Sequence, residues 1–161
     1  MNNLHYLRLS VVCTFFSIFI THAWGCNYSY QYKSSDQIKN IINNNSLSDP
    51  SVSTEDCERL NHFTPFLKSN HLIFLLGGDS FVAHGVSIGW GFVRLRDQYG
   101  IVSLNDGQDT YVNPDPSDNT ASQMMRNAII KSIIFIDLSE AINSIRKQEM
   151  AAGLKPIPAF H

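Results

Sequence analysis

The feature that most restricts the fold of this chain is an apolar, glycine-rich stretch, residues 70–104 (NHLIFLLGGDSFVAHGVSIGWGFVRLRDQYGIVSL). Residues 71–76 form a continuous apolar run that Gly77 and Gly78 close, which is typical of a strand buried on both faces. Over residues 86–92, apolar residues then alternate with serine and glycine, which predicts a strand with one buried face. The apolar positions of this second strand are Val86, Ile88, Trp90 and Phe92.

The apolar positions change parity at the end of this second strand. Val93 and Leu95 are apolar, whereas Arg94 and Arg96 are charged. Because successive side chains of a strand point to opposite faces, the change predicts a β-bulge or a different covering layer near Phe92 and Val93.

Turn and strand signals after this point complete the predicted sheet. Residues 97–100 (DQYG) have the Asp and Gly of a type I turn, which would lead into a partner strand at residues 101–104. Residues 110–112 (TYV) predict another short strand. The sequence therefore predicts an α+β fold, with a small antiparallel sheet of three to four strands within residues 71–112 that packs by one face against a C-terminal helical segment.

Helical spacing of apolar residues lies on both sides of the predicted sheet. Short helices are predicted within residues 34–45 and 53–70, each after a serine that can cap its first turn. Longer helical patterns cover residues 120–136 and 139–152. The run IIFI at residues 133–136 could also form a strand, but its short length and its helical surroundings favour a helix.

The N-terminus has the pattern of a secretory signal peptide. Arg8 precedes an apolar run that is too short to span a bilayer, which needs roughly 20 residues. Cleavage could follow Ala23 or Gly25, and we take residues 1–25 as the signal peptide. Residues 26–161 then form a single exported domain, periplasmic or secreted, that is long enough to bury a core.

Two cysteines, Cys26 and Cys57, remain after this cleavage. An even number of cysteines in an exported chain predicts one disulfide, which would contribute roughly 3 to 4 kcal/mol by restricting the unfolded chain. The alternative is a lipoprotein, because the sequence Ala-Trp-Gly-Cys distantly resembles the lipobox of bacterial lipoproteins. In that case Cys26 would carry a lipid anchor.

Charge and side-chain spacing disfavour several classes of ligand. Without Arg8, eleven of the twelve basic residues remain against fourteen acidic ones, and no long basic cluster is present. Nucleic acids and anionic membrane surfaces are therefore poor candidate partners. Asp79 and the histidines His62, His71 and His84 lack the spacing of metal ligands, so we expect neither a metal nor a cofactor.

The sequence Gly78-Asp79-Ser80, which follows an apolar strand, resembles the first block of the GDSL (SGNH) esterases. The resemblance covers residues 73–85 and implies Ser80 as the nucleophile, with His84 and Asp79 as the nearest base and acid. The Asp-x-x-His element that supplies the acid and base in that family does not follow in this chain. A small secreted serine esterase is therefore the alternative function.

The aromatic and cationic residues at the end of the second strand favour a binding function. Arg and Tyr often anchor protein interfaces, which makes Arg94, Arg96 and Tyr99 the predicted binding residues, on the sheet face that the helix leaves uncovered. The same charges could instead only protect a sheet edge from aggregation. We expect a non-catalytic exported protein-binding or accessory module, such as an envelope-complex subunit or an inhibitor (immunity-type protein) of a secreted enzyme.

Overall fold

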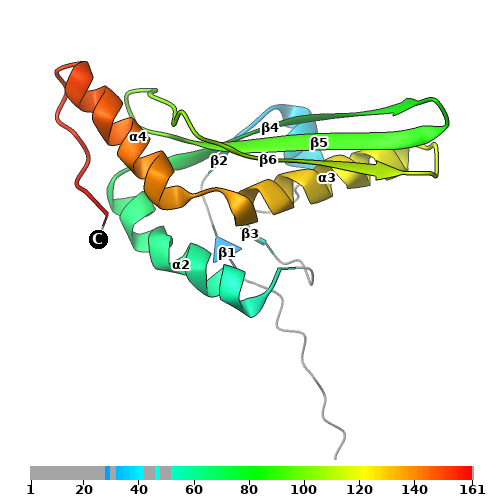
Figure 1. Cartoon of the computed structure of the whole chain (residues 1–161), viewed down its shortest axis with the longest axis horizontal. Coiled ribbons are helices and arrows are strands. Elements are labelled where there is room, and N and C mark those ends of the chain that lie inside the picture. Colours follow the sequence, from blue (N-terminus) through cyan, green and yellow to red (C-terminus); the bar gives the residue numbers. More distant parts are fainter. Residues whose placement is uncertain (1–27, 30–31, 42–45, 48–51, 161) are drawn as a thin grey trace, which may run out of the picture.

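A long β-hairpin forms the centre of the structure, a computed structural model that describes residues 28–29, 32–41, 46–47 and 52–160. Figure 1 shows the sheet lying over the long helix α3, with α2 and α4 towards one end of it. The fold is α+β, as predicted. Its elements are β1 (Tyr28–Ser29), β2 (Tyr32–Lys33), α1 (Asp36–Ile41), β3 (Ser46–Leu47), α2 (Thr54–Ser69), β4 (Ile73–Ala83), β5 (Val86–Arg96), β6 (Gly107–Asn113), α3 (Asp118–Phe135) and α4 (Leu138–Ala151).

The main sheet has the strand order β2-β4-β5-β6, in which β4, β5 and β6 are antiparallel and β2 adds two residues parallel to β4. The hairpin turn consists of His84 and Gly85, whose φ angles of 52° and 78° are those of a two-residue type I′ turn. Strand β4 runs through Gly77 and Gly78 to Ala83, so the prediction that these glycines end the strand was wrong.

Strands β4 and β5 pair one to one along their whole length, from Ile73 with Arg96 to Ala83 with Val86. The predicted β-bulge near Phe92 and Val93 is therefore wrong, and so is the predicted change of covering layer. The buried positions of β5 are Ser87, Gly89, Gly91, Val93 and Leu95. The apolar residues of the first half of β5 thus lie on the opposite face from the one that the helix covers.

Helix α3 covers this face so closely that only glycine fits at the contact. A Cβ atom at Gly89 would lie 2.7 Å from the Cα of Met125, and one at Gly91 would lie 2.5 Å from the Cγ1 of Ile129. The hydroxyl of Ser132 lies 2.7 Å from the carbonyl oxygen of Ala128 and 3.0 Å from that of Gly91, so it can donate to either. The small residues of β5 are therefore its packing positions.

The helices mostly follow their sequence signals. Helix α3 extends to Phe135, so residues 133–135 are helical as predicted. The side chain of Ser53 caps α2 by accepting from the backbone N–H of Asp56 at 3.1 Å, and Pro65 lies inside this helix without ending it. Arg59 of α2 donates to the carbonyl oxygens of Ile134 and Ile136, which are free at the end of α3.

The core lies between the sheet and the three longer helices. The largest fully buried apolar side chains come from all four of these parts: Leu60, Phe74, Leu95, Met125, Ile129, Ile133, Ile136, Leu138, Ile142 and Ile145. Residues 101–104 form no strand beyond a single bridge of Val102 with Arg96, so the predicted partner strand was wrong and β6 takes that place. The predicted signal peptide and Cys26 lie outside the described residues. None of the described helices has the length and apolarity needed to cross a membrane.

Candidate functional site

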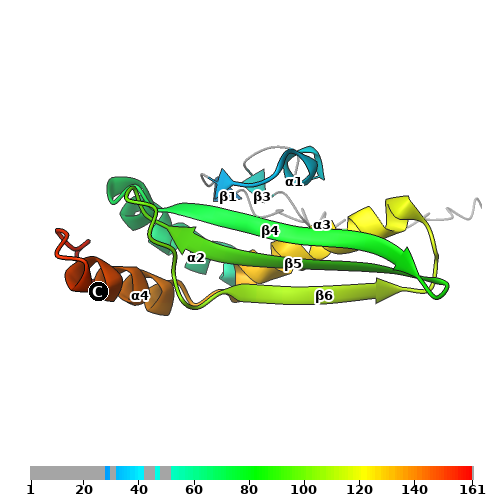
Figure 2. The same cartoon turned by 90° about the horizontal axis from the view of Figure 1, so that it is seen from above.

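The sheet face opposite α3 carries a row of aromatic and charged side chains along β5. Figure 2 looks onto this face, with α3 behind the strands. The rings of Trp90 and Phe92 stack at a centroid distance of 6.1 Å and an interplanar angle of 18°. The guanidinium carbon of Arg94 lies 5.8 Å from the centroid of the Phe92 ring. The three side chains therefore form one continuous stack along the strand.

Neighbouring strands widen this row with further apolar side chains. Phe81 of β4 and Val112 of β6 both lie directly opposite Ile88 of β5. Phe81 is 46% exposed, Trp90 39% and Val112 60%. Since neighbouring strands are about 4.8 Å apart, the apolar surface is about 10 Å wide at Ile88. We call these residues the open-face patch: Phe81, Ile88, Trp90, Phe92 and Val112.

Gly77 allows the open-face patch to be flat at the end where Phe92 lies. It pairs with Phe92, and a Cβ atom at Gly77 would lie 3.0 Å from the Cδ1 of the Phe92 ring, with two further ring carbons closer still. The Phe92 ring therefore lies down across β4 instead of standing away from the sheet. A flat apolar surface of this kind suits contact with another molecule.

The predicted binding residues occupy different parts of this end of the sheet. Arg94 donates from Nη2 and Nε to one oxygen of Asp106, at 2.8 and 3.2 Å, so its charge has a partner within the chain. The guanidinium of Arg96 lies against Gly100 in the turn that follows β5. Tyr99 lies in the same turn and is exposed. The structure thus places Arg94 and Arg96 on the face of Trp90 and Tyr99 beyond the end of β5.

The residues of the esterase alternative are separated by the strand. Ser80 pairs with Gly89 and lies on the α3 side, whereas Asp79 pairs with Trp90 and lies on the open face. The carboxylate of Asp79 accepts from the backbone N–H of Ser80 at 2.7 Å. His84 is in the hairpin turn, and four residues of extended strand place its Cα about 13 Å from that of Ser80. These three side chains do not form a nucleophile, base and acid in mutual contact.

The histidines named in the sequence lie apart from one another. His62 packs edge-on against Phe63 and Phe160, and His71 is in the turn before β4. In the part of the chain that the structure describes, no three His, Cys, Asp or Glu side chains come together as metal ligands.

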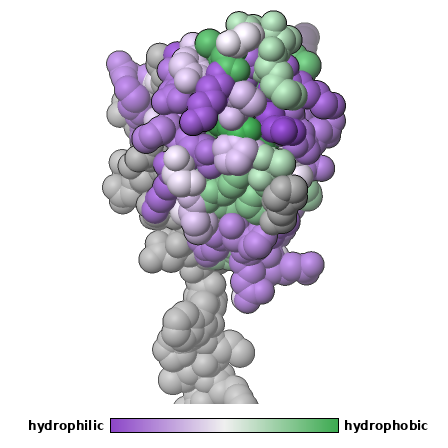
Figure 3. All heavy atoms as spheres, turned by 90° about the vertical axis from the view of Figure 1, so that its left-hand side faces the viewer, coloured by the Kyte–Doolittle hydropathy of each residue, from purple (hydrophilic) through white to green (hydrophobic). Residues whose placement is uncertain are grey.

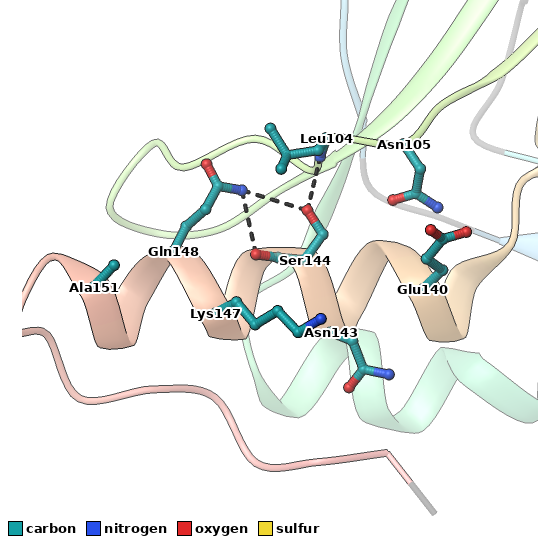
Figure 4. Close-up of a pocket in the computed structure, with 8 residues that line it drawn as sticks. All are labelled: Leu104, Asn105, Glu140, Asn143, Ser144, Lys147, Gln148 and Ala151. Atoms are coloured by element: carbon teal, nitrogen blue, oxygen red, sulfur yellow. Dashed lines mark hydrogen bonds between the residues drawn. The ribbon is translucent and has the colours of Figure 1, made fainter.

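A pocket of about 310 Å³ lies between α4 and the loop before β6. Figure 4 shows that its polar groups hold this loop on the helix: Ser144 accepts from the backbone N–H of Leu104 at 2.8 Å, and Gln148 contacts Ser144. Gln148 also donates to the carbonyl oxygen of Val102 at 3.0 Å. Figure 3 views this end of the molecule, where hydrophilic and apolar areas alternate. These contacts give the pocket a structural role.

Sequence reasoning did not identify Phe81, Ile88 and Val112 as surface residues. It assigned the apolar positions of residues 86–92 to the covered face, because apolar side chains are usually the buried ones. The glycines at alternate positions were the available signal, since a strand face of Gly and Ser allows a helix to approach closely.

Comparison with known proteins does not assign the chain to a family. No protein-family model matches it, and no curated protein or solved structure matches it either. The open-face patch is therefore the basis for a functional hypothesis.

Proposed function

We propose that this protein is a non-catalytic, exported protein-binding or accessory module, such as an envelope-complex subunit or an immunity-type inhibitor of a secreted enzyme, which binds its partner through the open-face patch. One observation carries the proposal. The unbroken alternation of β5 places Ile88, Trp90 and Phe92 on a sheet face that none of the described helices covers. Contiguous apolar surface on a soluble protein commonly marks an interaction site.

The composition of the patch indicates the chemistry of the partner. Its centre is apolar and aromatic, and its rim carries a salt bridge between Arg94 and Asp106. Because Asp106 already balances Arg94, we infer that the partner presents an apolar anchor at its centre and not an acidic surface. Tryptophan with neutral contacts around it is the usual composition of an interface hot spot.

We expect Trp90→Ser combined with Ile88→Ser to abolish partner binding. Truncation of a hot-spot residue costs about 2 kcal/mol or more, which corresponds to at least about a 30-fold loss of affinity. The measurement is affinity capture from the native envelope or culture medium, followed by titration of the captured protein. Phe135→Ser is the matched control, since Phe135 is an exposed aromatic residue on α3, outside the patch. Equal capture by wild type and the double variant would contradict the proposal.

Two further variants separate the alternatives that the sequence left open. Arg94→Ser with Arg96→Ser should weaken capture without aggregation if these residues form the rim of the interface. If this double variant aggregates but still captures the partner as well as wild type does, the two arginines serve only to protect the sheet edge from aggregation. Ser80→Ala should bind like wild type, and ester hydrolysis that is lost in this variant would instead support the esterase.

A further inference from the structure

Two buried carboxyl groups meet where the turn after β5 contacts α4. Asp97 is 4% exposed and Glu149 is 0% exposed. One oxygen of Asp97 accepts from the backbone N–H of Ile101 at 2.7 Å, which holds the turn. One oxygen of Glu149 accepts from the backbone N–H of Ile157 at 2.7 Å, which holds the chain that follows α4. We call Asp97 and Glu149 the carboxyl pair.

The second oxygen of each carboxyl group has no other hydrogen-bond partner. Asp97 Oδ2 and Glu149 Oε1 are both buried and both lack a donor. A side-chain hydrogen bond with Asp97 and the charge of Asp97 both favour the protonated form of Glu149 and so raise its pKa. Two adjacent buried carboxylates repel each other and lack water, whereas one shared proton satisfies both remaining oxygens. One proton held between Asp97 and Glu149 would therefore give both of these oxygens a hydrogen-bond partner.

The carboxyl pair lies at the start of a C-terminal tail, residues 154–160, that crosses from α4 to α2. The backbone N–H of Leu154 donates to the carbonyl oxygen of Glu149 at 2.9 Å, and the side chain of Ile157 is buried. Phe160 stacks on Phe63 of α2 at a centroid distance of 4.3 Å. Figure 1 shows the tail returning along α4 towards α2.

Burial is the largest cause that raises the pKa of Glu149 above its usual value of 4.5, and the hydrogen bond and charge of Asp97 raise it further. The N–H of Ile157 acts in the opposite direction. Other charged groups on the surrounding elements are Arg96 on β5, Arg146 on α4, Lys155 on the tail and His62 on α2, whose ring packs against Phe160. Asp97 is the charged group that acts on Glu149.

We propose that the proton shared by the carboxyl pair controls the C-terminal tail: the tail stays docked on α2 while the proton is bound, and it detaches when the proton is lost. The tail is the part that moves, because it contributes only Ile157 to the buried core, whereas α4 and β5 are anchored there by several side chains, among them Ile142, Ile145 and Leu95. Detachment gives water access to Glu149 and uncovers the aromatic side chains that Phe160 contacts on α2, Phe63 and Phe66.

The direction of the pH effect follows from the raised pKa. The docked form binds the proton more tightly than the detached form, so docking is strongest below pH 4.5 and weakens as the pH rises through the raised value. Between pH 4.5 and the raised pKa of Glu149, each pH unit favours detachment about tenfold. Above the raised pKa, the equilibrium between the docked and detached forms no longer changes with pH.

The experiment is amide hydrogen exchange measured by NMR on the whole domain, from pH 4.5 upwards. We expect the protection factor of the Ile157 amide to fall about tenfold per pH unit between pH 4.5 and the raised pKa of Glu149 and then to level off. Protection at Ile145 in the middle of α4 should not change, which separates detachment of the tail from global unfolding.

Glu149→Gln tests the shared proton directly. The glutamine amide can donate permanently to Asp97 and its oxygen can still accept from Ile157, so the tail should remain docked at every pH. Glu140→Gln removes an exposed carboxylate from the same helix and should keep the pH dependence of wild type. If Glu149→Gln does not fold, Asp97→Asn gives the same test, because its amide can donate to Glu149 while its oxygen accepts from Ile101. The proposal would be overturned if protection of the Ile157 amide did not change with pH in the wild type. It would also be overturned if that protection fell with pH in either amide variant as it does in the wild type.

Discussion

Gly89→Val should destabilise the protein by about 3 kcal/mol or more, at or beyond the upper end of the usual cost of overpacking. The first atom of the new side chain would lie within 2.7 Å of the Cα of Met125, and the other atoms nearest to it also belong to the backbone of α3. No side chain can rotate to make room, so the whole helix has to move off the sheet. The measurement is the free energy of unfolding from chemical denaturation.

Gly153→Ala provides the matched control for this prediction. Gly153 has a φ of 69°, and a Cβ atom built there would meet open space, so alanine adds backbone strain without a clash. Such strain costs about 1 to 2 kcal/mol. A Gly89→Val variant as stable as Gly153→Ala would show that α3 does not approach the sheet as closely as described.

Loss of the predicted disulfide should have the second largest effect. Cys57 lies in the first turns of α2 and is disulfide-bonded. Its predicted partner, Cys26, lies outside the described residues, so the pairing remains a prediction. A loop of this length contributes roughly 3 to 4 kcal/mol, and Cys57→Ser should lower the thermal midpoint by about 10 °C.

The control for the disulfide is Cys13→Ser, which removes only a cysteine of the predicted signal peptide and should leave the midpoint of the mature protein unchanged. Differential scanning calorimetry with and without reductant measures the effect. Non-reducing peptide mapping identifies the pair, and two free thiols or an acylated Cys26 in that map would contradict the prediction.

Local sequence signals were sufficient to predict the helices and the presence of the two central strands, but not the length of β4 or the regular pairing of β5. Ser53 caps α2 as its side chain predicts, and the isoleucine-rich end of α3 is helical because it continues a long helical pattern. These features depend on neighbours within one or two turns, which a sequence displays directly.

The covered face of β5 could not be read from alternation alone. A period of two identifies a strand with two different faces, but it does not state which face the helix occupies. Helix α3 packs on the face of β5 that carries the glycines, because Gly89 and Gly91 allow backbone-to-backbone contact with α3 that larger side chains would prevent. The predicted strand at residues 101–104 does not form for another tertiary reason. Ser144 and Gln148 of α4 hydrogen-bond to backbone groups of this segment that would otherwise pair with a strand.

The candidate site was partly predictable for the same reasons. Parity alone places Arg94 and Arg96 on the face of Trp90, and the structure agrees. The contributions of Phe81 and Val112 depend on strand register, and the pairing of Arg94 with Asp106 depends on the path of the loop before β6. None of these is encoded in a local pattern.

The two-residue turn of the β4–β5 hairpin also has a consequence for how the chain folds. Its eleven residue pairs extend outward from His84 and Gly85, so each new pair closes only a slightly larger loop than the last. Contacts of such low sequence separation form early, and hairpins of this kind form within about 1 to 10 μs. Docking of α3 onto the glycine face comes later and completes the core. We therefore expect the stack of Trp90 and Phe92 to be exposed to solvent from the earliest hairpin to the finished domain, so a newly made chain meets its environment with this surface uncovered throughout.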